Sequence, residues 1–256
     1  RGCCDAGELH RPHAERRPSH ADRRDDVAVP ASHGSRDGVQ ALFELLDPKA
    51  TGVTFANTIT TSDSVNIQTD VYVYNGAGVA VGDVNGDGLP DLYFTGNMVS
   101  SRLYLNKGGM KFEDVTARAG VGTTRWATGA AMVDINGDGK LDIYVSVSGP
   151  EWSTPEQRAN LLFVNNGDGT FTEAAEQYGV ADRGFSTHAA FLDYDGDGCL
   201  DLFVLNNSPQ DFSRGAAAVP AAGARDTTSG GDNELYRNDC RPGSGPGRAA
   251  HFTNVS

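Results

Sequence analysis

Three stretches of the chain share one pattern of apolar and polar positions. Each has a short apolar run, then nine residues rich in Asp, Asn and Gly, then a second short apolar run. The three stretches cover residues 78–94, 129–145 and 188–204. Short apolar runs between turn-forming residues are typical of β-strands, whereas the helices of a solenoid need longer amphipathic segments. The pattern therefore predicts three β-hairpins, each with an acidic loop.

A second hairpin is predicted after each acidic loop. Its residues are 102–115 in the first repeat, 160–171 in the second, and 234–239 with 252–255 in the third, where an interruption separates the two strands. Turns such as Asn166-Gly167-Asp168-Gly169 supply the positive φ angles that tight hairpins need. Two hairpins give four strands, which is one blade of a β-propeller.

The spacing of the repeats agrees with propeller blades. The acidic loops begin at Asp83, Asp134 and Asp193, which are 51 and 59 residues apart, and a period of about 50 residues is typical of blades with four short strands. We therefore predict an all-β fold, a β-propeller with blades at about residues 75–125, 126–184 and 185–256. Because propellers close with four to eight blades, we expect a partial propeller from a longer protein.

The remaining segments have a different composition. Residues 1–38 combine mixed charge and proline without an apolar period, which predicts a disordered tail. Residues 39–74 are expected to form a lead-in segment, with a short helix at Val39–Leu46 and an outer strand at Thr51–Thr60, where apolar residues alternate. Residues 208–232 are rich in Ala, Gly and Pro, which predicts a disordered insertion.

Each acidic loop follows the pattern D-x-[DN]-x-D-G-x-x-D. Calcium prefers six to eight oxygen ligands from carboxylates, amides, backbone carbonyls and water. Positions 1, 3, 5 and 9 offer side-chain oxygens, Gly at position 6 permits a sharp turn, and position 7 offers its backbone carbonyl. The predicted ligands are Asp83, Asn85, Asp87, Leu89 and Asp91 in the first loop, Asp134, Asn136, Asp138, Lys140 and Asp142 in the second, and Asp193, Asp195, Asp197, Cys199 and Asp201 in the third.

An EF-hand, a plain turn and a magnesium site each fit the acidic loops less well than a calcium site. An EF-hand needs Glu at position 12 and flanking helices, but position 12 is Phe94, Val145 or Val204, and the flanking segments are predicted strands. Turn formation explains one Asp-Gly-rich loop, but not four oxygen-bearing positions kept in register three times. Mg²⁺ is a poorer candidate because it keeps its water ligands and needs stricter geometry. The sequence therefore predicts three calcium sites.

The charge of the chain agrees with cation binding. The formal net charge is −13, so nucleic acid is not an expected partner, because phosphate binding needs a basic surface. The loops place ten carboxylates close together, and three Ca²⁺ ions would change the formal charge from −13 to −7. No apolar run approaches the roughly 20 residues of a membrane-spanning helix.

The cysteines leave two questions open. Cys199 and Cys240 can form a disulfide in an exported protein or remain separate thiols, and the sequence favours separate thiols. Arg1-Gly2-Cys3 is compatible with the remnant of a lipoprotein cleavage site, with Cys3 as the acylated residue. The apolar segment that would support a lipid anchor is not in the sequence.

Few residues outside the loops indicate a further site. Trp126 and Phe185 each lie eight residues before a loop aspartate and are expected to pack between blades. Packing is also the expected role of Trp152, although an exposed Trp can stack on a sugar. His188 takes the place of a Gly in the other repeats and can line a central channel, but no second His or nucleophile accompanies it. A structural role is therefore expected.

The order of strand, acidic loop and strand, followed by Leu103-Tyr104-Leu105-Asn106 or its equivalents, resembles the FG-GAP/VCBS repeats of integrin α-subunit propellers. It resembles in particular the cartilage acidic protein and ASPIC/UnbV group of secreted proteins. The resemblance covers about residues 39–256, and residues 42–57 with Tyr74-Asn75-Gly76 resemble the beginning of bacterial members, which are often lipoproteins. It implies about seven blades, calcium in the loops and an extracytoplasmic location. The chain departs from the group in having three calcium blades and no C-terminal ASPIC/UnbV module.

These observations predict a calcium-stabilised, non-enzymatic scaffold that binds a protein or glycan on the cell surface or elsewhere outside the cytoplasm. No catalytic triad is legible, and aspartates already used as ligands are poor general acids or bases. One alternative is a carbohydrate-active lyase or hydrolase with His188 in its site. Another is a purely structural segment of a larger protein. Propellers host many functions, so the fold alone does not decide.

Overall fold

The structure is a computed structural model, and it describes residues 43–68, 73–150, 153–207, 232–240 and 250–256. Its internal contacts divide the chain into two units, Arg1–Leu45 and Leu46–Ser256, and every helix and strand described below lies in the second. Several predictions fall outside the described residues: the tail at 1–38, Cys3, Trp152, and the insertion at 208–232 apart from Asp232.

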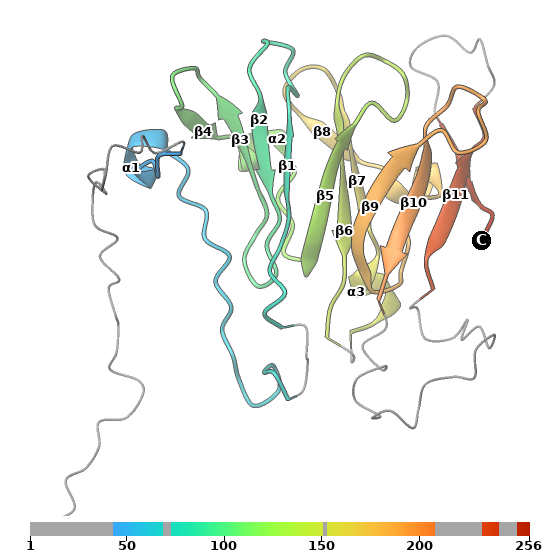
Figure 1. Ribbon diagram of the computed structural model, residues 1–256, viewed down its shortest axis with the longest axis horizontal. Helices are drawn as coiled ribbons and strands as arrows, with labels where there is room; N and C mark the ends of the chain where they lie inside the picture. The colour runs from blue at the N-terminus through green and yellow to red at the C-terminus, as the bar shows by residue number, and fades with distance from the viewer. Residues whose placement is uncertain (1–42, 69–72, 151–152, 208–231, 241–249) are drawn as a thin grey trace, which may run out of the picture. The chain divides into compact units, whose positions relative to one another are not determined.

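The second unit contains three antiparallel sheets, each with four strands in chain order (Figure 1). The first sheet has β1 (Val79–Gly82), β2 (Asp91–Phe94), β3 (Arg102–Asn106) and β4 (Phe112–Asp114). The second has β5 (Ala127–Val133), β6 (Asp142–Val147), β7 (Leu161–Asn165) and β8 (Phe171–Glu173). The third has β9 (Ser186–Leu192), β10 (Asp201–Asn206), β11 (Glu234–Asn238) and β12 (Phe252–Asn254). The prediction of four-stranded blades is confirmed.

The sheets pack face to face through two apolar clusters. Tyr93, Leu103 and Ile143 belong to the cluster between the first and second sheets. Tyr144 and Leu202 belong to the cluster between the second and third sheets. Ile143 and Tyr144 are neighbours in β6 yet point to opposite sheets, because successive side chains of a strand alternate between its faces. Every residue of β6 is buried, so the middle blade has both faces covered.

The first strands of the three sheets lie side by side, with β5 in contact with both β1 and β9. Glycine permits this approach. A Cβ on Gly78 would lie 2.9 Å from the Cα of Gly129, and a Cβ on Gly129 would lie 2.8 Å from the carbonyl oxygen of Thr187. Both distances are too short for real Cβ contacts, so larger residues would push the strands apart. The third repeat has His188 at this position, and its side chain is exposed.

Two short helices connect the blades. α2 (Thr116–Ala119) and α4 (Ala175–Tyr178) each end at a Gly with φ 75°. The residue after each Gly is a buried Val whose carbonyl accepts a hydrogen bond from a buried tyrosine. Tyr93 donates to Val121 at 2.8 Å, and Tyr144 donates to Val180 at 2.9 Å. None of the helices in the described ranges has the length and apolar character to cross a bilayer.

The helix of the lead-in segment does not lie where the sequence predicted it. Residues 43–46, the described part of the predicted helix Val39–Leu46, are not helical. α1 (Pro48–Thr51) forms instead directly after Asp47, whose carboxylate accepts a hydrogen bond from the Lys49 N–H at 2.9 Å. An N-cap followed by Pro therefore starts the helix later than the apolar pattern suggested.

The predicted outer strand at Thr51–Thr60 is absent from the described residues, although burial alternates along this segment as the pattern requires. Phe55 stacks on Phe94 of β2, with 5.2 Å between ring centroids. The alternation therefore reflects side chains that pack on the first sheet from one side, rather than a strand within a sheet.

Candidate metal sites

The acidic loops are the turns between the first and second strands of each sheet. The ninth loop residue pairs with the residue before the first, as Asp91 pairs with Gly82 in the first blade. The fourth and sixth residues are Gly in every loop, with φ between 70° and 88°. This region of φ is open to Gly and costly for residues with a Cβ. The Gly positions therefore let each loop curl.

The carboxylate at position 1 organises each loop from inside. Asp83 accepts hydrogen bonds from the backbone N–H groups of positions 4, 5 and 6 at 2.8, 3.1 and 2.7 Å. Asp193 accepts the same three at 2.8, 3.1 and 3.0 Å. Asp134 accepts from positions 5 and 6 at 3.0 and 2.9 Å. The three loops thus share the hydrogen bonds from positions 5 and 6, and the first and third loops add the one from position 4.

The side chains at positions 3 and 5 continue this pattern. The position 3 oxygen accepts the N–H of position 5 at 3.0 to 3.2 Å, and the position 5 carboxylate accepts the N–H of position 7 at 2.9 Å. In the third loop the carboxylate oxygens of Asp193, Asp195 and Asp197 lie within 4.8 Å of one another. This is roughly twice a calcium–oxygen distance, so the donor set fits Ca²⁺.

The aspartate at position 9 has a different environment. Asp91, Asp142 and Asp201 are fully buried. One oxygen of each accepts the N–H of position 2 at 3.0 or 3.1 Å, and the other accepts an N–H from the third strand of the sheet at 2.8 Å. Each carboxylate therefore fastens its loop to the third strand. Every carboxylate oxygen has a second lone pair that can coordinate a cation.

The third-strand partners are Asn106, Asn165 and Asn238, and sequence reasoning did not assign them a role. Each buried Asn side chain also donates to the carbonyl of position 8 in its own loop, at 3.0 or 3.1 Å. Asn165 donates in addition to the Val84 carbonyl of the first loop at 2.8 Å, which connects two blades. The signal in the sequence is an Asn that ends the same apolar run in all three repeats.

Burial raises the pKa of two position 9 carboxylates. Burial raises the pKa of Asp142 to about 6, and the charges of Asp138 and Asp134 act in the same direction, while two backbone N–H groups oppose the rise. Burial likewise raises the pKa of Asp91. A cation in the loop would favour the ionised carboxylates. The loops therefore hold acidic groups together at a cost that a bound cation lowers.

The second loop carries a positive charge of its own. The Lys140 ammonium nitrogen lies 3.0 Å from a carboxylate oxygen of Asp138. Burial alone would raise the pKa of Asp138, but the hydrogen bonds and charge of Lys140 outweigh it and hold this pKa below its ordinary value. The same position is Leu89 or Cys199 in the other loops. A cation in the second loop would compete with an ammonium group for one carboxylate oxygen.

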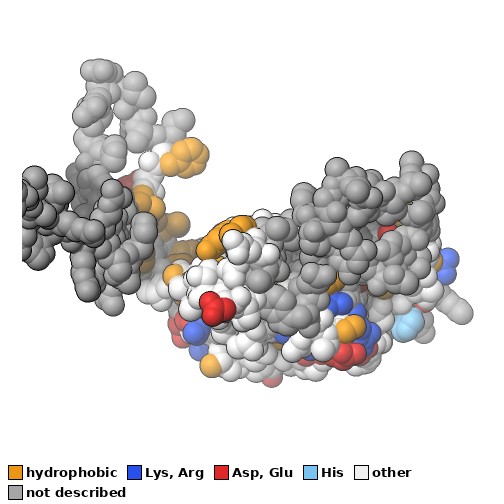
Figure 2. Space-filling model, turned by 90° about the horizontal axis from the view of Figure 1, so that it is seen from below, with side chains coloured by type: hydrophobic (Ala, Val, Ile, Leu, Met, Phe, Trp, Pro, Cys, Tyr) orange, Lys and Arg blue, Asp and Glu red, His pale blue; other side chains and the backbone are white. Residues whose placement is uncertain are grey.

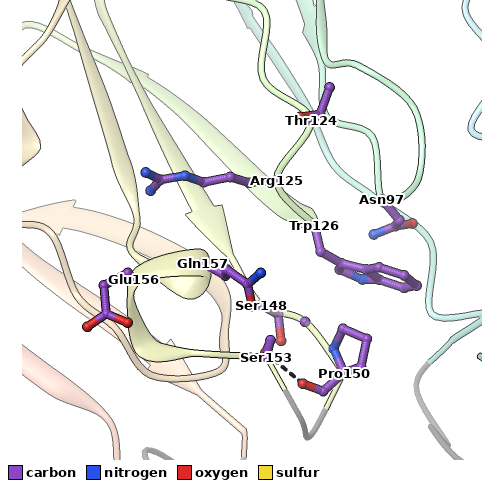
Figure 3. Close-up of a pocket in the computed structure, with 10 residues that line it drawn as sticks. Asn97, Thr124, Arg125, Trp126, Ser148, Pro150, Ser153, Glu156 and Gln157 are labelled. Carbon is purple, nitrogen blue, oxygen red and sulfur yellow. Dashed lines mark hydrogen bonds between the residues drawn. The ribbon is translucent and has the colours of Figure 1, made fainter. Parts of the chain in front are cut away.

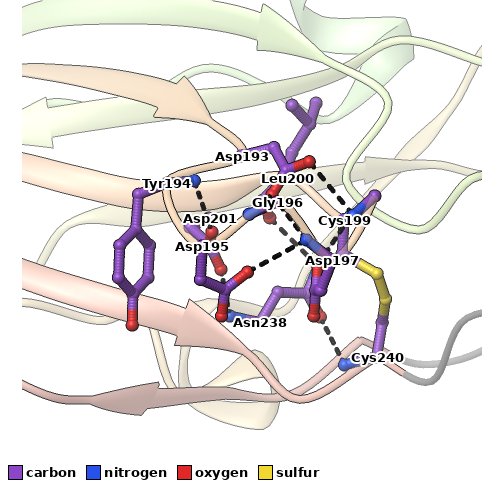
Figure 4. Close-up of a disulfide and its surroundings, with 11 residues drawn as sticks. Asp193, Tyr194, Asp195, Gly196, Asp197, Cys199, Leu200, Asp201, Asn238 and Cys240 are labelled. Atoms are coloured by element: carbon purple, nitrogen blue, oxygen red, sulfur yellow. Dashed lines mark hydrogen bonds between the residues drawn. A yellow bond between two sulfur atoms is a disulfide. The ribbon is translucent and has the colours of Figure 1, made fainter.

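Cys199 and Cys240 form a disulfide next to the third loop (Figure 4), so the prediction of two separate thiols is wrong. Cys199 is position 7 of that loop. Cys240 follows β11, and its N–H donates to the side chain of Asn238 at 3.1 Å. The 41-residue separation hid the pair, because the two cysteines meet only when β10 and β11 pair. The disulfide therefore connects the third loop to the end of β11. The same strand donates the Asn238 N–H to the Asp201 carboxylate.

The fifteen predicted ligand positions thus gather in three loops at one end of the sheets (Figure 1). Ion binding by these side chains, and by the carbonyls of Leu89, Lys140 and Cys199, stays a prediction.

The aromatic residues and the histidine singled out in the sequence have different environments. Phe185 is buried, and the guanidinium carbon of Arg158 lies 4.1 Å from its ring centroid. Trp126 is half-buried and lines a pocket. His188 lies on β9 with its ring exposed, and within the described residues no hydrogen bond orients it as a general base.

Two segments, residues 83–145 and 152–204, match the family described as FG-GAP-like repeat. These two segments are therefore similar to FG-GAP-like repeats. The first matched segment runs from the first acidic loop through the second, and the other ends in β10 after the third loop. The two matched segments therefore include all three candidate metal loops.

Cartilage acidic protein 1 from three vertebrates is similar to this chain. The human protein is 31% identical over 163 residues, which are 58% of this chain and 23% of that protein. The Xenopus tropicalis protein is 28% identical over 170 residues, which are 66% of this chain and 25% of that protein. The Mus musculus protein is 25% identical over 222 residues, which are 65% of this chain and 34% of that protein. The chain thus spans about a quarter to a third of the length of these curated relatives.

Proposed function

We propose that this chain is a calcium-stabilised, non-enzymatic binding or adhesion scaffold outside the cytoplasm. The observation that supports it is a repetition at two levels. Three loops share one pattern of oxygen-bearing residues. In all three, the carboxylate at position 1 accepts hydrogen bonds from the N–H groups of positions 5 and 6, and the buried Asp at position 9 accepts one from the N–H of position 2. Turn formation alone needs neither the clustered carboxylates nor their common register.

The residues at positions 1, 3, 5 and 9 and the carbonyl at position 7 would hold each ion. A bound Ca²⁺ supplies positive charge that offsets the repulsion among the carboxylates. The chain's own residues contribute a loop that is already curled and fastened to the sheet by Asp91, Asp142 or Asp201. An ion there would brace the hairpin at one end of the blade rather than take part in chemistry.

The proposed location rests on two observations. FG-GAP-like repeats and similarity to cartilage acidic protein 1 favour an extracellular type of scaffold. The disulfide between Cys199 and Cys240 favours an oxidising compartment, because cytosolic thiols are kept reduced. A lipid anchor at Cys3 is a separate proposal, which mass spectrometry of the protein from its native membrane fraction would test.

A thermal unfolding experiment tests the role of calcium. Saturating Ca²⁺ is expected to raise the midpoint of the 256-residue chain, and EGTA is expected to lower it. A site filled at 100 times its Kd contributes about 2.7 kcal/mol, which is roughly 5–10 °C for a domain of this size. Isothermal titration should give three ions per chain, with Mg²⁺ binding far more weakly.

The matched variants carry one Asp→Asn change at position 5 of each loop: Asp87→Asn, Asp138→Asn and Asp197→Asn. The Asn oxygen can still accept the N–H of position 7, so the loop keeps its shape and loses a charge. Each variant should lose part of the calcium-dependent rise. Asp87→Asn and Asp197→Asn should keep their midpoint in EGTA, whereas Asp138→Asn also loses the ion pair with Lys140. A wild-type midpoint that responds to neither Ca²⁺ nor EGTA would contradict the proposal.

A further inference from the structure

A pocket of about 580 Å³ lies where the first two blades meet, and it is lined in part by Trp126 (Figure 3). Its lining residues come from the loop after β2, the segment before β5 and the loop after β6. β2 and β6 both begin at an acidic loop and run away from it, and β5 runs toward one. The pocket therefore lies at the opposite end of the sheets from the candidate metal loops.

Backbone hydrogen bonds fix the wall that carries Trp126. The Trp126 carbonyl accepts the N–H of Ser148 at 2.9 Å. The next residue, Ala127, donates its N–H to the Gly96 carbonyl at 3.1 Å and accepts a hydrogen bond from the Asn97 side chain at 3.1 Å. Both blades therefore hold the Trp126 backbone, which fixes this wall of the pocket.

The loop after β6 is also anchored. Arg158, only 8% exposed, donates to the backbone of Ser153 and to the Arg183 carbonyl, and its guanidinium stacks on Phe185. α3 (Pro155–Arg158) begins with a capping box formed by Thr154 and Gln157. These contacts hold the loop that forms the second wall of the pocket.

The lining combines one flat aromatic ring system, the indole of Trp126, with polar groups. Trp126 and Pro150 supply apolar surface, and in Figure 3 the indole lies between Pro150 and Asn97. The rest of the lining is mainly hydroxyl, amide and charged side chains, including Thr124 and Ser148. The indole N–H has no hydrogen-bond partner within the described residues. The volume is ordinary for a small-ligand site, but such sites are usually more apolar.

The charges in the pocket do not favour an anionic ligand. Arg125 is the cationic side chain of the lining, and it already donates to the Ala159 carbonyl. The carboxylate of Glu156 also lines the pocket. At this end of the molecule, basic and acidic side chains are interspersed with uncharged ones where the surface is described (Figure 2). A phosphate or sulfate group would therefore find no concentrated positive charge.

We propose that this pocket binds a neutral saccharide, with one sugar ring stacked on Trp126. A pyranose ring has an apolar C–H face that suits an indole, and its hydroxyl groups suit a ring of donors and acceptors. This inference deepens the proposed scaffold function, on which it rests for its biological setting, by naming a class of partner.

Saturation-transfer NMR on the 256-residue chain tests the proposal. The probes are maltose, cellobiose, lactose and diacetylchitobiose, with glucose 6-phosphate and a mixture of short peptides as competitors of other classes. At least one disaccharide should receive saturation from the protein, strongest at the C–H protons of one ring face. Runs in Ca²⁺ and in EGTA, each with a melting curve, separate failure of the pocket from failure of the calcium brace.

Three variants at two positions test the pocket. Trp126→Ala should weaken saccharide binding about tenfold or more, while Trp126→Phe should retain most of it because an aromatic plate remains. Ser148→Leu keeps the indole and fills the pocket, so it should also abolish binding. Met110→Ala is the control, because Met110 is exposed in the turn after β3, at the end of the first sheet that carries the acidic loop.

The result that supports the proposal is disaccharide binding that Trp126→Ala and Ser148→Leu reduce and Met110→Ala leaves unchanged. The proposal is overturned if none of the four disaccharides binds to the folded wild-type chain. It is also overturned if Trp126→Ala binds the disaccharide as tightly as wild type does. Displacement of the bound disaccharide by glucose 6-phosphate or the peptides, but not by the other disaccharides, would overturn it as well.

Discussion

At the residue scale, the aspartates of one loop have two different roles. Those at positions 1 and 5 lie in the curled part of the loop and accept hydrogen bonds from within it. The one at position 9 is buried and fastens the loop to the third strand of its sheet. One residue type thus shapes the loop at two positions and joins it to a strand at a third, and substitution can separate the two roles.

Asp91→Asn and Asp87→Asn make this comparison in the first loop. Asp91 accepts one N–H on each oxygen, so an Asn there places an NH₂ group against a backbone donor. We expect Asp91→Asn to lower the free energy of unfolding by about 1–3 kcal/mol even in EGTA. Asp87→Asn should lose stability only when Ca²⁺ is present.

Urea unfolding of both variants, with Ca²⁺ and with EGTA, measures the difference. If Asp91→Asn in EGTA is as stable as wild type, the hydrogen bonds to Val84 and Asn106 do not hold the loop in solution.

The place of the acidic loops between the first and second strands of each sheet was predictable, because three copies of the loop keep the same residue types at the same spacing. The role of Asn106 was not, since it depends on which backbone groups meet after the strands pair. The same reason hid Asp182. This buried carboxylate accepts hydrogen bonds from Ser186 of β9, Asn206 of β10 and Tyr236 of β11. In the sequence Asp182 is one isolated Asp, whereas in the structure it is the centre of a hydrogen-bond network.

At the element scale, the approach of neighbouring first strands depends on glycine. Gly129 in β5 lies against Thr187 of β9, where even a methyl group would lie too close to a carbonyl oxygen. The sequence showed a Gly in two repeats and His188 in the third, but the reason became visible only with the blades packed. Conversely, the lead-in segment alternates like a strand without being one, because packing on one face of a sheet produces the same pattern.

Gly129→Ala tests this close approach. The new Cβ would lie 2.8 Å from the Thr187 carbonyl oxygen, so β5 and β9 must separate. We expect a loss of about 1–3 kcal/mol in the free energy of unfolding, as for other overpacked sites. Chemical denaturation gives the value.

His188→Ala is the matched control on the neighbouring strand. The His188 side chain is exposed, so the substitution should change the free energy of unfolding by no more than about 0.5 kcal/mol. The new Cβ of Gly129→Ala would also lie 3.1 Å from the His188 ring nitrogen, so the double variant should recover at most a small part of the loss, because the Thr187 carbonyl remains in place. Stability equal to wild type in Gly129→Ala would mean that the strands lie farther apart than the structure has them.

At the scale of the whole molecule, each blade contacts its neighbours along the chain. The two apolar clusters both include residues of the second sheet, while the first and third sheets each contribute to one. The third sheet also leaves Leu192 and Leu205 more than 40% exposed. Stability should therefore be distributed unevenly, since local opening needs the least energy where the fewest apolar contacts are lost.

Hydrogen exchange measured by mass spectrometry follows this distribution. Amides of β6 and β7 should exchange most slowly, because β6 is buried along its whole length. Amides of β1 and β10 should exchange faster, because exposed residues interrupt their burial. Ca²⁺ should slow exchange around all three acidic loops while leaving this order of the sheets unchanged. Slow exchange in the first or third sheet equal to that of the second would mean that another surface covers their outer faces. A repeat of the experiment at lower protein concentration then decides whether that surface belongs to a second copy of the chain.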